Sequence, residues 1–200
     1  MQRKKLRQEV LVQNRLVKEL VSLQNILNDQ SIADILLVRS WFKPSALVEV
    51  SYLPHRQYSR SQFLTAVRHL EKILQKLGLF YKLHLNYPKN QNNLTQFSYI
   101  ALDPKMLKKL IKADERRDTK KRRMEVGKLL GYPKTAVVAF ANGKVFARSK
   151  LPKAILKTST IKFLNFQLSR NWKRELKYVR RRAQEIEKIS PVLFRRIVSN

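Results

Sequence analysis

Carboxylates that could bind a divalent metal ion form a local group in only one part of this sequence. They are Asp103, Asp114, Glu115, Asp118 and Glu125. An enzyme that cleaves nucleic acid would use such side chains to hold metal ions beside the attacking and leaving oxygens. Most of these carboxylates lie among Lys and Arg residues, which is typical of ordinary ion pairs. We therefore predict no catalytic residue and no metal site, with a metal-dependent nuclease as an alternative.

Neither histidine nor cysteine offers another reactive site. The three histidines, His55, His69 and His84, are far apart and lack the short spacings of zinc-binding motifs. The sequence has no cysteine, which excludes disulfides, thiolate nucleophiles and cysteine-ligated zinc. No cofactor is expected, and the protein is predicted not to be an enzyme.

Basic residues dominate the charge of the chain. Among 200 residues, 43 Lys and Arg face 14 Asp and Glu, which gives a formal net charge of +29. A folded protein with so much self-repulsion is typical of one that a polyanion neutralises. No signal peptide or membrane-spanning run is expected. We therefore predict a nucleic-acid partner, no membrane partner, and an intracellular location in a compartment that contains nucleic acid, the cytoplasm or the nucleoid.

Two basic segments are the candidate contact surfaces. Residues 114–123 contain no apolar side chain, so this segment is either a solvated charge run or a surface that follows a phosphate backbone. Its candidate contacts are Arg116, Arg117, Lys120, Lys121, Arg122 and Arg123. The second segment, residues 144–200, holds +13 of the net charge. We expect it to supply most of the binding surface.

An amphipathic helix is predicted over residues 168–189, before Pro191. Its apolar residues recur every three or four positions; they are Leu168, Trp172, Leu176, Val179, Ala183, Ile186 and Ile189. The remaining positions include Lys173, Arg174, Lys177, Arg180, Arg181 and Arg182. One side of the helix is therefore expected to pack and the other to bind nucleic acid. A membrane surface, a calmodulin-type partner and plain solvation are the alternatives for such a helix.

The first half of the chain predicts an α+β fold. We expect an antiparallel four-stranded sheet with packed helices, its strands at residues 35–41, 46–53, 79–87 and 97–102. A helix is predicted between Ser59 or Ser61, as its N-cap, and Gly78. A longer helix is predicted over residues 2–28. Its leucines resemble a short coiled-coil seam, so this helix is either a dimer contact or packed on its own domain; they are Leu16, Leu20, Leu23 and Leu27.

These elements divide the chain into two predicted parts. Residues 1–102 form the α+β domain with its long N-terminal helix, and residues 103–200 form a basic helical region that contains a helix-turn-helix corner. The predicted sheet carries aromatic residues that either stack on unpaired bases or belong to the core; they are Tyr81, Tyr87, Phe97 and Tyr99.

Residues 30–111 resemble one half of a LAGLIDADG homing endonuclease. The resemblance rests on the order of the elements, on L-x-x-I-L-x-x-L-G from Leu70 to Gly78, on an asparagine-rich hairpin loop, and on K-x-L-K-K-L-I from Lys105 to Ile111. It implies a sheet that lies on DNA like a saddle. The acidic motif that holds the family's catalytic metal has no counterpart in residues 23–35, so nuclease activity is not implied.

A tight corner of two short helices is predicted over residues 126–143, with Gly131 in a left-handed cap between them. The segment resembles the helix-turn-helix of lac-repressor-type regulators at Lys128, Leu129, Gly131, Lys134, Val137, Asn142 and Gly143. This resemblance implies contacts with DNA by Lys134 and Thr135. Apolar residues between 136 and 139 occupy positions where a recognition helix needs polar side chains. The second helix is therefore either a recognition helix or a buried one.

The same segment is also similar to an uncharacterised prokaryotic domain family with the pattern G-x-L-L-G-Y-P-x-C-C-V-x-x-F. The matching residues are Gly127, Leu129, Leu130, Gly131, Tyr132, Pro133, Val137 and Phe140. Thr135 and Ala136 replace the two cysteines of that pattern, so no function of those thiols is implied. The pattern accommodates an apolar second helix.

Together these features predict a non-enzymatic nucleic-acid-binding protein that contacts the phosphate backbone through basic helices. The helix-turn-helix spacing and the expected sheet favour DNA slightly over RNA. The aromatic residues of the sheet and the apolar second helix favour RNA or binding driven by shape. An RNA- or ribosome-associated scaffold protein is the main alternative.

Overall fold

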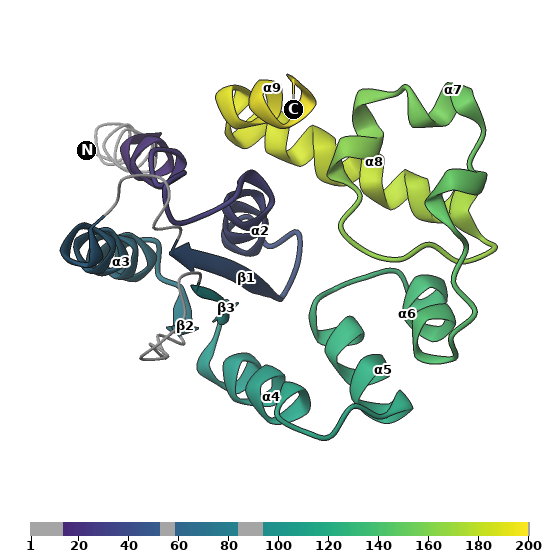
Figure 1. Cartoon of the computed structure of the whole chain (residues 1–200), viewed down its shortest axis with the longest axis horizontal. Coiled ribbons are helices and arrows are strands. Elements are labelled where there is room, and N and C mark those ends of the chain that lie inside the picture. Colours follow the sequence, from purple (N-terminus) through teal and green to yellow (C-terminus); the bar gives the residue numbers. More distant parts are fainter. Residues whose placement is uncertain (1–13, 53–58, 84–93, 200) are drawn as a thin grey trace, which may run out of the picture.

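The computed structural model describes residues 14–52, 59–83 and 94–199 (Figure 1). In this part of the chain a small antiparallel sheet packs with helices, so the fold is α+β. Residues 14–21 form the first helix. The elements after it are α2 (Asp29–Arg39), β1 (Ser45–Tyr52), α3 (Arg60–Lys76), β2 (Phe80–Lys82), β3 (Leu94–Ala101), α4 (Pro104–Asp114), α5 (Lys120–Leu129), α6 (Lys134–Ala141), η2 (Arg148–Lys150), α7 (Lys153–Leu156), η3 (Ser159–Phe163), α8 (Trp172–Ile189) and α9 (Pro191–Ser199).

The sheet has three strands within the described residues, in the order β1-β3-β2. Both outer strands run antiparallel to β3, and Ala101 of β3 pairs with Ser45 on one side and with Phe80 on the other. The prediction of a four-stranded sheet is therefore wrong. Residues 35–41, predicted as a strand, form the second half of α2 and the turn after it.

α2 has no helical stripe in its sequence because the helix is buried on all sides. Asn28 caps it by accepting a hydrogen bond from the backbone N–H of Ser31 at 2.8 Å, and residues 31–38 are all buried. An enclosed helix needs no polar face, so its apolar run lacks the 3.6-residue period. Such a run cannot be distinguished from a buried strand by its pattern alone.

The first helix is shorter than the predicted helix over residues 2–28. Residues 2–13 lie outside the described residues, and the helix ends at residue 21, well before α2 begins. The leucines of the expected dimer seam are buried in the core of the single chain; they are Leu16, Leu20, Leu23 and Leu27. Within the described residues, this seam therefore packs on the protein's own core.

One main hydrophobic core draws on both predicted parts of the chain. It contains Leu20, Ile35 and Leu70 from the first part, and Val179 and Leu193 from α8 and α9. In Figure 1, α8 and α9 lie on the side of α2 that faces away from the sheet, and both pack against α2. The predicted boundary at residues 102 and 103 falls between β3 and α4, and the core crosses it.

A buried charged cluster holds α8 against α2. Asp34 accepts hydrogen bonds from Lys43 Nζ at 2.8 Å and from Arg182 Nη2 at 3.1 Å, and the Asn165 amide donates to the same carboxylate at 3.2 Å. Burial alone would raise the pKa of Asp34, but the charges of Lys43 and Arg182 and the hydrogen bonds outweigh it and hold this pKa below its ordinary value of 3.8. The carboxylate therefore stays ionised, and it fixes which side of α8 faces inward.

Four of the described helices end in the same left-handed cap. After α3, α5 and α6 the left-handed residue is a glycine, Gly78, Gly131 or Gly143, whereas after α2 it is Trp41, with a φ of 64°. The Trp41 N–H donates to the carbonyl of Val38 at 3.1 Å, and the next N–H donates to the carbonyl of residue 37 at 3.0 Å. This pair of hydrogen bonds is the Schellman motif, in which glycine is preferred because a side chain is strained at positive φ.

Candidate nucleic-acid interface

One side of α8 is a row of exposed basic side chains. Val179, Ala183 and Ile186 face the core, and five of the predicted contact residues are exposed on the other side; they are Lys173, Arg174, Lys177, Arg180 and Arg181. We call these five residues the outer face of α8. At 1.5 Å per residue they extend along about 12 Å of the helix axis.

Among the described helices, α8 included, none is long and apolar enough to cross a membrane.

Arg182 does not belong to this row, although its sequence neighbours do. Its side chain is 1% exposed, and it donates to the carbonyl of Phe163 at 2.6 Å and to the carboxylate of Asp34 at 3.1 Å. The sequence holds a signal for this position, because Arg182 comes three residues after Val179 and four before Ile186 and so lies on the apolar stripe. A guanidinium enclosed in this way is not available to a phosphate.

A basic hollow lies beside the start of α8. It has a volume of about 810 Å³, and three exposed cations line it: Lys134 of α6, Lys144 after α6, and Arg170 just before α8. The other residues that line it are Thr135, Val138, Ala139, Asn142, Val145, Ser169 and Asn171. No carboxylate is among these lining residues. The prediction named Lys134 as a contact. Lys144 and Arg170 fell within the predicted basic segment 144–200 but were not named as individual contacts.

Thr135 connects α6 to α8 instead of reaching outward. Its hydroxyl donates to Glu175, a carboxylate of α8 that is 1% exposed. Glu175 also accepts hydrogen bonds from the backbone N–H of Ser169, at 2.8 Å, and from the Ser169 hydroxyl. The Thr135 hydroxyl, which was predicted to contact DNA, is therefore bound to a carboxylate of the protein itself. Its bond places the basic hollow next to the outer face of α8.

Residues 116–123 form the α4–α5 turn and the start of α5. Half of the basic residues predicted to contact nucleic acid in this segment are ion-paired within the protein. Arg116 pairs with Glu125, Arg122 with Asp114 at 2.6 Å, and Arg123 with Asp118 at 2.7 Å. The members of the predicted set that are exposed and form no ion pair within the described residues are Arg117, Lys120 and Lys121. This segment therefore offers fewer unpaired cations than its sequence indicates.

The same ion pairs occupy the carboxylates that could have held a metal. The hydrogen bond and charge of Arg123 lower the pKa of Asp118, and Glu115 pairs with Lys82 at 3.2 Å. Asp103 accepts a hydrogen bond from the backbone N–H of Met106 and so caps α4. Across residues 14–52, 59–83 and 94–199, no group of three or more Asp, Glu, His or Cys side chains is placed to hold a metal ion.

α6 buries the side that a recognition helix would present. Four of its eight residues are buried, Ala136, Val137, Ala139 and Ala141, and its exposed residues are Lys134 and Phe140. Gly127 of α5 allows the close approach, because a Cβ there would lie 2.9 Å from a methyl carbon of Val137. This geometry favours packing over base reading.

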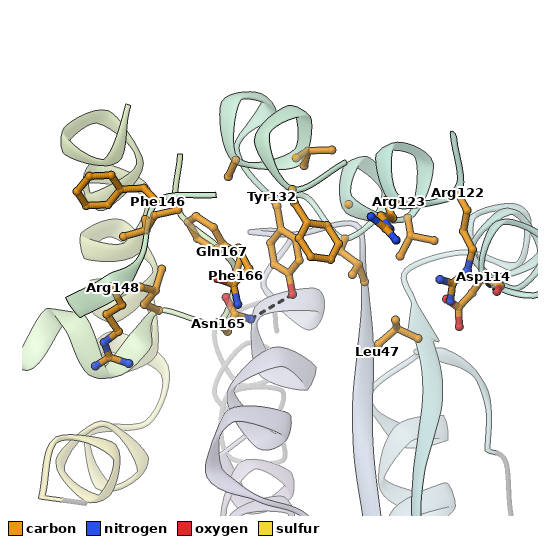
Figure 2. Close-up of a pocket in the computed structure, with 18 residues that line it drawn as sticks. Leu47, Asp114, Arg122, Arg123, Tyr132, Phe146, Arg148, Asn165, Phe166 and Gln167 are labelled. Carbon is orange, nitrogen blue, oxygen red and sulfur yellow. Dashed lines mark hydrogen bonds and ion pairs between the residues drawn. The ribbon is translucent and has the colours of Figure 1, made fainter. Parts of the chain in front are cut away.

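An aromatic pocket lies against the opposite face of α6 (Figure 2). Its volume is about 540 Å³, and Figure 2 shows Tyr132 and Phe166 at its centre, between Arg148 on one side and Arg122 and Arg123 on the other. The hydroxyl of Tyr132 accepts a hydrogen bond from the Asn165 amide at 3.5 Å. Burial, followed by the charge of Asp34, raises the pKa of Tyr132 well above its ordinary value, so this hydroxyl stays neutral.

A chain of aromatic rings leads from this pocket to the outer face of α8. The ring centroids are 5.4 Å apart for Tyr132 and Phe166, 5.8 Å for Phe166 and Tyr178, and 5.3 Å for Tyr178 and Phe42. The guanidinium of Arg181 lies 6.0 Å from the centroid of Phe42. Pocket and outer face are therefore parts of one packed unit.

The aromatic residues predicted to stack on bases are divided by the structure. Tyr99 is buried and donates a hydrogen bond to Asp114 at 2.9 Å, and Tyr81 is half-buried. Phe97 is exposed on β3, and Tyr87 lies outside the described residues. The sheet therefore does not present these rings as one row.

Comparisons of the chain with protein-family models, curated proteins and solved structures gave no match. The resemblances of residues 30–111 and 126–143 to known families stay predictions. The function is therefore proposed from the geometry of the site.

Proposed function

We propose that the protein is a non-enzymatic nucleic-acid-binding protein that holds the phosphate backbone on the outer face of α8 and in the basic hollow. One observation carries the proposal. Eight exposed cations gather there from α6, from the segment after it and from α8; they are Lys134, Lys144, Arg170, Lys173, Arg174, Lys177, Arg180 and Arg181.

The lack of acidic partners distinguishes these eight cations from the ion-paired arginines of residues 116–123. Within the described residues none of the eight forms an ion pair, whereas Arg116, Arg122 and Arg123 all do. Exposed cations of an ordinary solvated surface are usually interspersed with acids. A concentration of unpaired positive charge favours a polyanionic ligand.

The number of cations sets the salt dependence that we expect. If each of the eight neutralises one phosphate, the slope of log affinity against log salt is about −7 for duplex DNA and about −6 for a single strand. Contacts with phosphates carry no base sequence. We therefore propose binding with little sequence preference, and the helix-turn-helix resemblance makes DNA the first ligand to test.

Removal of charge from two helices tests the proposal. The triple variant K177Q/R180Q/R181Q removes three charges from the outer face of α8. The matched control R68Q/K72Q/K76Q removes three exposed charges from α3, which lies at the other end of the molecule in Figure 1. Binding of duplex and single-stranded DNA by the full chain is then measured over a salt series.

The α8 variant is expected to lose about 2.7 from the magnitude of the duplex slope, since each lost phosphate contact contributes about 0.9. The α3 control is expected to keep the slope of the natural chain. Equal losses in the two variants would mean that total charge and not this surface attracts the ligand. A natural chain that binds no nucleic acid at about 150 mM salt would refute the proposal outright.

A further inference from the structure

Trp41 occupies a position that neither backbone geometry nor packing explains. It is the left-handed residue after α2, with a φ of 64°, where the equivalent caps after α3, α5 and α6 have glycine. A side chain at positive φ strains the backbone. The Trp41 side chain is 75% exposed, so burial does not compensate for that strain. Strained residues of this kind gather at functional sites.

The residue that follows Trp41 packs against α8. The next residue, Phe42, packs its ring on Tyr178, with centroids 5.3 Å apart. The guanidinium of Arg181, on the outer face of α8, lies 6.0 Å from the Phe42 centroid. An exposed indole therefore lies one residue away from a ring that contacts the surface with the unpaired cations.

We propose that Trp41 stacks on an unpaired base of a nucleic acid whose backbone lies on the outer face of α8. The ligand class is then single-stranded or locally unpaired nucleic acid, and this inference rests on the proposed function. Every base has a flat π face, and aromatic side chains stack on it with little sequence preference. In a continuous duplex both faces of a base are covered by its neighbours, so Trp41 finds no partner there.

The position of Arg181 completes the contact. Stacking supplies an interaction with the base, and the guanidinium next to Phe42 supplies a charge for the adjacent phosphate. A combination of aromatic platforms with a positively charged surface is the general mode by which proteins hold single strands without reading their sequence.

Fluorescence of Trp41 gives a direct test. The chain has two tryptophans, and the other, Trp172, is half-buried and stacks on Phe146 with ring centroids 6.3 Å apart. A Trp172→Phe variant of the full chain therefore reports on Trp41 alone. Titration with a single-stranded DNA oligonucleotide at constant salt is expected to quench its emission to saturation. A duplex long enough to make its ends negligible is expected to bind without comparable quenching.

Substitution of Trp41 separates stacking from folding. Trp41→Gly removes the ring and the backbone strain together, so this variant is expected to unfold at a higher denaturant concentration than the natural chain. Its affinity for the single strand is expected to be about 5- to 140-fold lower. Its affinity for the duplex and both salt slopes stay unchanged, because no charge is lost. Trp41→Phe keeps an aromatic face and most of the affinity.

Phe97→Leu is the matched control, because it removes an exposed ring from the sheet and is expected to change neither affinity. If Trp41→Gly binds single strands as tightly as the natural chain, and Trp41 emission is unchanged while binding proceeds, the inference is wrong and backbone binding stands. If the natural chain binds no nucleic acid, the proposed function fails and the inference fails with it. A response of Trp41 to anionic lipid vesicles, without one to the oligonucleotide, would identify a membrane contact and also overturn the inference.

Discussion

Arg181 and Arg182 are neighbours in α8 with opposite environments, and replacing each by methionine separates stability from binding. Arg182 donates to the carbonyl of Phe163 at 2.6 Å and to the carboxylate of Asp34 at 3.1 Å. Removal of one partner of a buried ion pair costs about 3–5 kcal/mol. Asp34 keeps its bond to Lys43 at 2.8 Å, and methionine fills part of the space. We therefore expect R182M to lower the free energy of unfolding by about 3 kcal/mol, the lower end of that range.

The exposed neighbour is expected to behave in the reverse way. The contact of Arg181 with the Phe42 ring is worth about 0.5–1 kcal/mol at an exposed site, so R181M lowers the free energy of unfolding by less than about 1 kcal/mol. It reduces the magnitude of the duplex salt slope by about 0.9, whereas R182M leaves that slope unchanged. Urea unfolding at pH 7, with one m-value for the three proteins, measures stability. A salt series of DNA-binding measurements gives the slopes.

Two results would refute this reasoning. Equal stability of R181M and R182M would mean that the buried cluster does not hold α8 on α2. A reduced salt slope in R182M, in a variant that is still folded, would mean that Arg182 reaches the nucleic acid. In that case α8 would present a different side from the one in the structure.

Three further predictions concern the cluster, the buried tyrosines and the helix caps. D34N leaves Lys43 and Arg182 buried without a counter-charge and is expected to cost about 3–5 kcal/mol in urea unfolding. D118N, at a carboxylate that is 56% exposed, is expected to cost much less, because solvent screens its ion pairs. Because the pKa of Asp34 is lowered on folding, the contribution of this carboxylate to the free energy of unfolding is complete above pH 3.8 and is lost as the pH falls further. The natural chain should therefore lose stability in acid more steeply than D34N. Parallel plots of stability against pH for the two proteins would contradict the ionised state of Asp34. Burial raises the pKa of Tyr178 to about 12 from 10.0. The contribution of its neutral hydroxyl to the free energy of unfolding is therefore complete below pH 10.0 and is lost as the pH rises toward 12. Y178F should flatten the dependence of stability on alkaline pH, with tyrosinate absorbance as the readout. G131A should destabilise the protein more than G78A. Both glycines have positive φ, but a Cβ on Gly131 would lie 2.9 Å from Pro44, whereas one on Gly78 would meet nothing within 4 Å. Equal losses of stability in chemical denaturation would show that the backbone strain at positive φ, about 1–2 kcal/mol, is the only cost of either substitution.

Helices with one polar and one apolar side were predictable from the sequence. α3 begins at the capping box of Ser59 and Gln62 and ends before Gly78. α8, Trp172–Ile189, falls within the predicted range 168–189. These signals work because a cap and a 3.6-residue period arise from contacts within one or two turns of the same helix.

The sheet was less predictable, because two kinds of element share one pattern. Residues 31–38 are buried on all sides in α2, and an apolar run of this kind suits a central strand as well as an enclosed helix. Only the packing of β1, α8 and α9 around it decides between the two. The prediction of four strands failed at this element for that reason.

The candidate site shows the same division. Net charge and the period of α8 were contained in the sequence, and they pointed to a basic helix with a packed side. The tertiary structure decided which cations remain available, because the sequence does not say which carboxylate each cation meets. Arg116, Arg122 and Arg123 pair with carboxylates 5 to 9 residues away, and Arg182 pairs with one in a distant segment. Arg182 meets Asp34 across 148 residues, Thr135 meets Glu175 across 40, and folding brings Lys134 and Lys144 beside Arg170 and Phe42, the neighbour of Trp41, against Tyr178 of α8. The local order of residues determines the helix α8. The burial of Arg182 and the position of the exposed Trp41 ring depend on contacts between distant segments, which exist only after the chain has folded.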